Sequence, residues 1–209
     1  TILIAFLCMI TATPQIVSAA ANENRAASVR ALRRATIDPL TRLVNRPAFE
    51  DRAKHALQRH PQEMMALAYL DLDQFKLVND TLSHRTGDEL LKSLAAALAS
   101  VIRPGDVFAR LGGDEFALLL RKVDHSEALR LAQELRRVVA DFRFPHQGRV
   151  IAPTTSIGLV PFIAAESDFA GLFAQADAAC FTAKELGGNR VQVATADEPQ
   201  VHDRRNAMD

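Results

Sequence analysis

Apolar and polar residues from Asp38 onward follow two patterns, one typical of buried strands and one typical of amphipathic helices. Short continuous apolar runs predict strands, at residues 65–72, 107–111, 116–120, 149–162 and 189–194. Apolar residues spaced three and four apart predict helices, at residues 45–57, 87–102, 126–142 and 168–186. Strands and helices therefore alternate, but two strands in the middle are separated only by a turn. Such a hairpin argues against a purely parallel sheet, so we expect an α/β (α+β) domain.

Local signals mark the ends of these helices. Asn45 is suited to cap the first helix, and Gly187 is suited to end the last one. Pro104 and Gly105 break the chain after the second helix. One face of that second helix collects large apolar side chains, at Leu90, Leu91, Leu94, Leu98 and Val101. One stripe of the last helix is also apolar, at Phe169, Leu172, Phe173, Ala176, Cys180 and Ala183.

The chain before Asp38 divides into an apolar and a charged segment. Residues 1–20 carry no charge and are long enough to cross a bilayer, although Pro14 and Gln15 weaken that interpretation. A secretory signal and a buried apolar helix are the alternatives. Arginines follow at once, and positive charge beside a spanning segment is typical of the cytoplasmic side. We expect a membrane anchor at 1–20, a helical linker at 21–37, a cytoplasmic domain at 38–195 and a loose polar tail at 196–209.

Composition narrows the classes of partner. Apolar residues make up 48% of the chain, which is enough for a buried core. Lys plus Arg and Asp plus Glu number 25 each, so no general basic field points to a nucleic-acid polymer. The sequence has two cysteines, Cys8 and Cys180, which indicate no disulfide framework and are consistent with a reducing compartment.

The central hairpin carries two adjacent carboxylates, Asp114 and Glu115, directly after Gly112 and Gly113. Glycines suit such a turn because they adopt positive φ without steric cost. A preference of turns for polar residues explains one carboxylate well and two adjacent ones poorly. The second carboxylate therefore suggests a functional role, which other residues of the chain would share.

Asp71 and Asp73 are candidates for such residues, at the end of the strand predicted at residues 65–72. Residues two apart in a strand face the same way, so these carboxylates can project together from one face of the sheet. A carboxylate from this strand and one from the neighbouring hairpin would form a site of hard oxygen ligands, which Mg²⁺ prefers. The alternative is that Asp71 and Asp73 only cap a helix that starts near Phe75.

Five stretches together resemble the GGDEF family of diguanylate cyclases, and they occur in the order of that family's motifs. They are DPLTRLVNR from Asp38, DLDQFKLVNDTLSHRTGDELL from Asp71, RLGGDEF from Arg110, TTSIGLV from Thr154 and AKELGGNR from Ala183. The resemblance implies a domain similar to the catalytic palm of nucleotidyl cyclases, with a central, mainly antiparallel sheet flanked by helices. It also implies a homodimer that condenses two GTP molecules into cyclic di-GMP, with Mg²⁺ or Mn²⁺ as cofactor.

The resemblance assigns roles to matching positions of this chain. It implies metal ligands at Asp71, the Leu72 carbonyl and Asp114, with Asp114 as candidate proton acceptor and Glu115 as a second required acid. It implies substrate contacts at Phe75, Lys76, Asn79, His84, Asp88 and Lys184. Asp88 distinguishes guanine, because its carboxylate can accept from N1–H and N2–H₂ whereas adenine offers no such pair of donors. Gly188 departs from the family, which often has a basic residue there, so that one phosphate contact is absent or comes from Arg190.

A second site is implied by RPGD at Arg103–Asp106, which matches the family's product-inhibition motif in type and in its offset from the hairpin. Guanidinium groups suit phosphates and guanine edges. A Pro-Gly turn with polar flanks is the alternative explanation. Arg136 and Arg137 on the following helix are equal candidates for a further arginine. An inactive cyclic di-GMP receptor or a GTP-sensing regulatory domain is the alternative function, although a receptor does not need an intact metal site.

Overall fold

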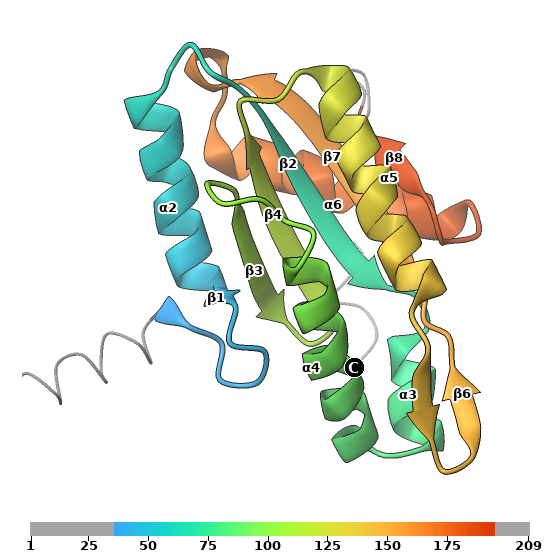
Figure 1. Cartoon of the computed structure of the whole chain (residues 1–209). Coiled ribbons are helices and arrows are strands. Elements are labelled where there is room, and N and C mark those ends of the chain that lie inside the picture. Colours follow the sequence, from blue (N-terminus) through green and yellow to red (C-terminus); the bar gives the residue numbers. More distant parts are fainter. Residues whose placement is uncertain (1–35, 195–209) are drawn as a thin grey trace, which may run out of the picture.

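The computed structural model describes residues 36–194, and we refer to it below as the structure. Within this range a six-stranded sheet has the order β1-β3-β4-β2-β7-β8 (Figure 1). Its strands are β1 (Val44–Asn45), β2 (Met64–Leu72), β3 (Val107–Gly112), β4 (Glu115–Arg121), β7 (Thr155–Ile163) and β8 (Val191–Val193). The four long strands pair antiparallel, and the short edge strands β1 and β8 pair parallel. The expected mainly antiparallel sheet is therefore confirmed.

Helices cover both faces of the sheet (Figure 1). They are α2 (Arg46–Arg59), α3 (Phe75–Thr81), α4 (His84–Ala99), α5 (His125–Asp141) and α6 (Phe169–Glu185), with a short 3₁₀ turn η1 (Ala164–Glu166). Alternate residues of β2 face opposite sides, so that Leu67 packs with α2 and α6 while Leu70 packs with α4 and α5. Both faces of β2 are thus buried, and this explains why its sequence is a continuous apolar run.

Two expected elements differ from the structure. Residues 149–162 do not form one strand: β6 (Arg149–Ile151) pairs with β5 (Phe144–His146) in a separate hairpin, and β7 begins only at Thr155. Pro153 lies between them, in a stretch of residues 152–154 that has no strand structure. The helix expected to reach residue 102 ends at Ala99, so Val101 is 38% exposed instead of buried.

The predicted helix cap at Asn45 and the predicted helix end at Gly187 are confirmed. The side chain of Asn45 accepts a hydrogen bond from Ala48 N at 3.1 Å at the start of α2. Gly187 follows α6 with φ of +107°. No helix within residues 36–194 is long and apolar enough to span a bilayer. The segments predicted at 1–20 and 196–209, and all but the end of the one at 21–37, lie outside the described residues.

Candidate active site

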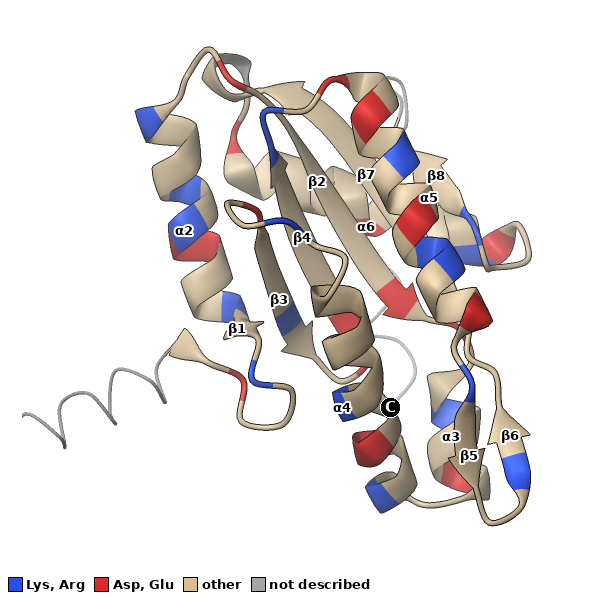
Figure 2. Ribbon diagram, in the orientation of Figure 1, with Lys and Arg blue, Asp and Glu red and all other residues tan. Residues whose placement is uncertain are grey.

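Asp71 lies at the end of β2, where the sheet brings it next to the turn of the β3–β4 hairpin. Its direct neighbour across the strands is Glu115 of β4, and Leu72 N donates a hydrogen bond to the carbonyl of Asp114 at 3.4 Å. Asp71 and Glu115 therefore project from the same face of the sheet, on the side of α6. Figure 2 shows acidic residues at the tip of β2. The expected gathering of carboxylates from β2 and the hairpin is thus present.

The hairpin turn is held by Arg110, to which the sequence analysis assigned no role. Gly113 has φ of +50°, as expected for a glycine in this turn. Arg110 Nε and Nη2 donate to the Gly113 carbonyl at 2.9 and 2.7 Å, and Nη1 donates to Asp38 Oδ1 at 3.1 Å. The position of Asp114 in the turn is therefore fixed by an ion pair between residues 72 positions apart. Both residues begin quoted motifs, but no sequence spacing indicates that they meet.

Lys184, from the last turn of α6, makes an ion pair with Asp71, its Nζ lying 2.6 Å from Oδ1. Burial raises the pKa of Asp71 to about 6, the negative charges of Asp114 and Glu115 add to this effect, and Lys184 opposes it. Burial lowers the pKa of Lys184, but the carboxylate of Asp71 outweighs it and the net shift is upward. The negative charges of the site therefore require nearby positive charge, and the ammonium group of Lys184 provides part of it.

These residues fit a divalent cation. Their side chains offer hard oxygen ligands, and mutual repulsion among three carboxylates is the property that a bound cation relieves. Within residues 36–194 no group of three or more His, Cys, Asp or Glu side chains is placed so that it could hold a metal ion by itself. The predicted set contains only two carboxylates, Asp71 and Asp114, beside the Leu72 carbonyl.

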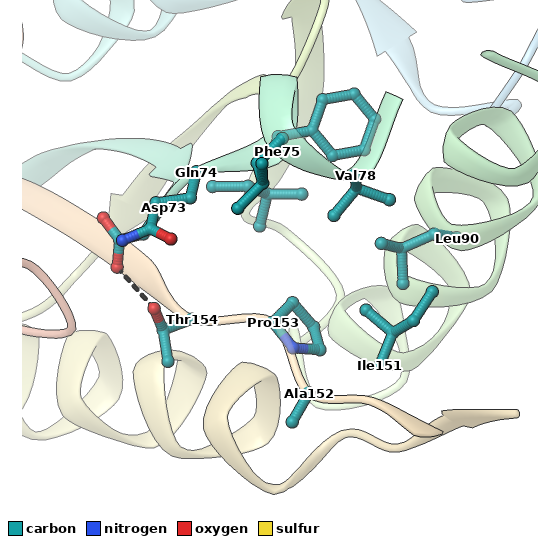
Figure 3. A pocket seen from close by; sticks show the side chains of 11 residues that line it. Asp73, Gln74, Phe75, Val78, Leu90, Ile151, Ala152, Pro153 and Thr154 are labelled. Carbon is teal, nitrogen blue, oxygen red and sulfur yellow. Dashed lines mark hydrogen bonds between the residues drawn. The ribbon is translucent and has the colours of Figure 1, made fainter. Parts of the chain in front are cut away.

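Asp73 does not join this group, contrary to expectation. Its carboxylate accepts a hydrogen bond from Thr154 Oγ1 at 2.7 Å (Figure 3). It also accepts hydrogen bonds from Ser156 Oγ at 2.7 Å and from Asn189 N at 2.8 Å. These bonds occupy the oxygen atoms that a metal would need. The alternative, in which Asp73 caps α3, is also wrong, because the cap residue is Gln74 and its side chain makes no capping bond.

The predicted base-binding residues lie on α3 and α4. Lys76, His84 and Asp88 are exposed, whereas Asn79 is half-buried against Gly87 of α4. Asn79 Oδ1 is buried and has no hydrogen-bond partner among the described residues. A buried amide oxygen without a partner is costly, and a donor on a bound ligand would relieve that cost.

A cavity of about 200 Å³ lies on another side of α3, between this helix and residues 151–154 (Figure 3). Mostly apolar side chains line it, including Val78, Leu90 and Pro153. Of the predicted substrate contacts only Phe75 is among its lining residues. The cavity is therefore distinct from the face of α3 that carries Asn79.

Arg103 and Asp106 meet at the opposite end of β4 from the hairpin turn. Arg103 Nε donates to Asp106 Oδ2 at 3.0 Å, and Arg121 N donates to Asp106 Oδ1 at 3.0 Å. The Arg103 guanidinium also donates to the carbonyl of Arg121. Both residues line a small hollow together with Glu134 of α5. The RPGD motif thus forms an ordered turn with a half-exposed arginine.

The structure separates the two candidate arginines of α5. Arg136 Nη1 donates to Asn189 Oδ1 at 2.8 Å, whereas neither Arg136 nor Arg137 is among the residues that line the hollow of Arg103. Arg137 lies three residues after Glu134 and so on the same helix face. Arg130, which pairs with Glu134 at 3.0 Å, lies on that face too and was not predicted.

A family model described as "Diguanylate cyclase, GGDEF domain" matches residues 35–190. The chain belongs to this GGDEF family. The match covers the helices, every strand of the sheet except β8 and the carboxylate site, so the family assignment and the site concern the same residues.

Named relatives and a solved structure agree with this assignment. Probable diguanylate cyclase DgcE of Escherichia coli (strain K12) is 39% identical over 176 residues, 83% of this chain and 16% of that protein. Cyclic di-GMP phosphodiesterase PdeB of Shewanella oneidensis is 34% identical over 182 residues, 84% of this chain and 20% of that protein. The coiled coil and GGDEF domain of DgcB from Caulobacter crescentus, crystallised with c-di-GMP, has a TM-score of 0.82 at 30% identity, covering 88% of this chain and 99% of that one. The chain therefore spans a fifth or less of these two curated relatives.

Proposed function

We propose that this GGDEF domain is a diguanylate cyclase that converts two GTP into cyclic di-GMP and two pyrophosphates. The observation that carries the proposal is the meeting of Asp71, the hairpin acids Asp114 and Glu115, and Lys184 at one end of the sheet. A 3′-hydroxyl attacks an α-phosphorus, the bond from that phosphorus to pyrophosphate breaks, and the hydroxyl proton leaves to a base. Two such steps close the ring.

The residues of the site have separate tasks in this proposal. Asp71, Asp114 and the Leu72 carbonyl would hold Mg²⁺, or Mn²⁺, which when bound neutralises triphosphate charge and acidifies the attacking hydroxyl. Asp114 lies in the turn fixed by Arg110, where it can accept the hydroxyl proton. Lys184 is long and half-exposed, so that its ammonium group can turn from Asp71 to a phosphate oxygen.

Guanine recognition is assigned to α3 and α4, with Asn79 and Asp88 as the reading pair and His84 beside them. The unpartnered Oδ1 of Asn79 supports this assignment, because guanine offers N–H donors that match it. The exposed carboxylate of Asp88 accepts the same class of donor. Phe75 and Lys76, at the start of α3, follow the metal strand directly and are assigned to the phosphates through their backbone.

A symmetric homodimer follows from the product. One domain has one carboxylate site in this proposal and binds one GTP, whereas cyclic di-GMP contains two equivalent phosphodiester bonds. Two domains related by a twofold axis supply equivalent attacks. Pairing of domains is then a natural point of control for signal transduction. A cytoplasmic domain attached to the membrane through residues 1–20 remains part of the proposal.

Product inhibition is assigned to Arg103 and Asp106. The ordered turn and the half-exposed guanidinium of Arg103 support it, because such a group can bind a phosphate or the edge of guanine. Arg137 and Arg130, on the α5 face beside Glu134, are the candidates for a further arginine. This site lies at the far end of β4 from Asp114, so product there would not compete with GTP directly.

An inactive receptor for cyclic di-GMP, or a GTP-sensing regulatory domain, is the alternative. GGDEF domains also occur in proteins named phosphodiesterases, such as PdeB above. A receptor that used only Arg103 and Asp106 would gain nothing from buried carboxylates that repel one another. The intact acids therefore favour the cyclase.

The test is a product assay with purified protein, GTP and Mg²⁺. We expect cyclic di-GMP from the unchanged chain, none from Asp114→Ala, and turnover without product inhibition from Arg103→Ala. Binding of cyclic di-GMP without any synthesis, under conditions in which the protein is dimeric, would support the receptor instead.

A further inference from the structure

The carboxylate of Asp73 is engaged from several directions although it lies only two residues from Asp71. Its partners are Thr154 before β7, Ser156 within β7 and the backbone N–H of Asn189 in the turn after α6. Asp73 N also donates to the Thr154 carbonyl at 2.9 Å. Hydrogen bonds to an ionised acceptor are short and strong, so these partners are held tightly. Asp73 therefore ties the turn after α6 to the ends of two central strands.

The turn at residues 187–190 lies in close contact with this carboxylate. Gly188 has φ of +70°, a conformation that favours glycine. A Cβ atom on Gly188 would lie 3.0–3.1 Å from the carboxylate atoms of Asp73. A side chain at this position would thus crowd Asp73. The departure of Gly188 from the family pattern therefore has a local consequence, which is the close approach of Asp73 to the turn.

Arg136 holds the same turn from helix α5. Its Nη1 donates to Asn189 Oδ1 at 2.8 Å, while its Nε donates to Gln133 Oε1 at 3.0 Å, one helical turn earlier. In Figure 1 the turn that leads into β8 lies beside α5. Asn189 is therefore fixed twice, by Asp73 through its backbone and by Arg136 through its side chain.

The turn at residues 187–190 is hydrogen-bonded to the end of α6. Gly187 N donates to the Lys184 carbonyl, and Gly188 N donates to the Ala183 carbonyl, each at 3.0 Å. These bonds close the last turn of the helix onto the residues that precede Asn189. A displacement of Asn189 is therefore transmitted to the backbone of Lys184, whose ammonium group reaches the carboxylate site.

We propose that Asp73 and Arg136 are positioning residues for the triphosphate side of the active site, an inference that rests on the function proposed above. Neither residue touches the reacting atoms. Both act on Asn189, and through the 187–190 turn they set where Lys184 stands relative to Asp71. Lys184 binds the phosphates both before and during the reaction, so its displacement should raise KM more than it lowers kcat.

A double-mutant cycle tests the proposal, with variants Arg136→Ala, Asn189→Ala and the combination of both. The first measurement is binding of 3′-deoxy-GTP with Mg²⁺ by titration calorimetry, because this nucleotide lacks the attacking hydroxyl. The second is steady-state turnover of GTP. We expect each single variant to weaken binding and raise KM by about three- to tenfold, with kcat changed less than about twofold. The double variant should be no weaker than the weaker single one, since Arg136 acts through Asn189.

Controls separate positioning from loss of fold. Arg59→Ala removes an exposed arginine at the end of α2, on the opposite face of the sheet from α5 and Arg136. Its nucleotide binding and turnover should match those of the unchanged chain. Asp73→Asn should shift binding in the same direction as Arg136→Ala, and Thr154→Val, which removes one donor, serves if Asp73→Asn does not fold. Thermal unfolding should show Arg136→Ala folded at the assay temperature.

Two results would overturn the proposal. Losses of affinity for 3′-deoxy-GTP that multiply in the double variant would mean that Arg136 does not act through Asn189. Unchanged affinity in Arg136→Ala would mean that Arg136 does not position Lys184. Absence of cyclic di-GMP synthesis by the unchanged chain would refute the cyclase, but binding of 3′-deoxy-GTP would still report on Asp73 and Arg136. The two failures are therefore distinguishable.

Discussion

Replacing Arg110 by alanine should damage both the stability and the chemistry of this domain. The guanidinium group joins the hairpin turn at Gly113 to Asp38, at the start of the described domain. Without it the Gly113 carbonyl loses two donors and Asp38 loses its counter-charge. Because Asp114 is the residue next to Gly113, the lost contacts bear on its position directly.

The magnitude follows from burial and from the contacts that remain. The side chains of Arg110 and Asp38 are only 12% and 16% exposed, so solvent screens their attraction weakly. Removing one partner of a fully buried pair costs about 3–5 kcal/mol, and one hydrogen bond to a charged group contributes about 1.5–3 kcal/mol. Asp38 keeps the hydrogen bonds from Thr41 N and Oγ1 at 2.8 and 2.7 Å, which lowers the cost. We therefore expect a loss of about 2–4 kcal/mol in the free energy of unfolding.

The assay compares Arg110→Ala with Arg121→Ala. Arg121 makes a similar two-bond pair with Glu63, at 2.9 and 3.0 Å, but at the opposite end of the sheet from the hairpin turn. Urea unfolding gives stability, and cyclic di-GMP formation below both unfolding midpoints gives turnover. Both variants should lose stability, but only Arg110→Ala should lose about 10- to 100-fold in turnover, since small displacements of a reacting group have effects of that size. Equal turnover in the two variants would refute the role of Arg110 in placing Asp114.

The pH dependence supplies a second check on Arg110. Burial tends to raise the pKa of Asp38, but hydrogen bonds from Thr41 and Arg110 outweigh it and lower the pKa below the ordinary value of 3.8. A lowered folded-state pKa contributes stability above the ordinary value, and this stability is lost as pH falls through the folded-state pKa. The difference in stability between the unchanged chain and Arg110→Ala should therefore narrow below about pH 3.8. A constant difference from pH 7 to pH 3 would mean that the charge of Asp38 is not involved.

Three further measurements follow from the same region. The pKa of Asp71 is about 6, above its ordinary value of 3.8, so the contribution of Asp71 to stability is present below pH 3.8 and is lost as pH rises through 6. Urea unfolding in EDTA should therefore show stability falling between pH 3.8 and 6, and Asp71→Asn should flatten this dependence of stability on pH. Gly158→Ala should cost about 3 kcal/mol or more by urea unfolding, because its Cβ would overlap the Ala176 carbonyl of α6, and a cost below 1 kcal/mol would contradict that packing. Burial raises the pKa of the Cys180 thiol to about 12, so in a Cys8→Ser variant, which leaves Cys180 as the remaining thiol, a thiol reagent at pH 7.5 should label the protein only after unfolding, and labelling of the folded variant would show that the Cys180 thiol is accessible.

The fold was predictable where local pattern and tertiary packing agree. The run at residues 65–72 is apolar at every position except Asp71, and the structure buries both its faces. The stretch 149–162 has the same apolar character, yet only its second half joins the main sheet. Apolar character cannot tell a strand of the core from one arm of a peripheral hairpin. Pro153 was the available signal that these are two strands.

The site was predictable as a group of carboxylates and unpredictable in its supports. Period-two alternation and the glycine turn sufficed to bring Asp71 together with the hairpin acids. The same alternation suggested a shared role for Asp73, but hydroxyl groups of β7 and its approach engage that carboxylate first. The choice between Arg136 and Arg137 was likewise open, because helical spacing defines faces and not their partners. In the structure, contacts with distant segments engage both Asp73 and Arg136.

The local energetics of the Asp71 site explain why it points to function. Like charges directly opposite on neighbouring strands are destabilising, and Asp71 faces Glu115 in that arrangement while burial opposes its ionisation. Lys184 relieves part of this repulsion, yet one ammonium group cannot neutralise three carboxylates. An apolar pair at the same strand positions would be expected to stabilise the sheet more. This energetic cost supports the proposed function, in which a cation and phosphates would relieve the repulsion, and the hydrogen bonds of Arg110 and Asp73 hold the neighbouring turns in place.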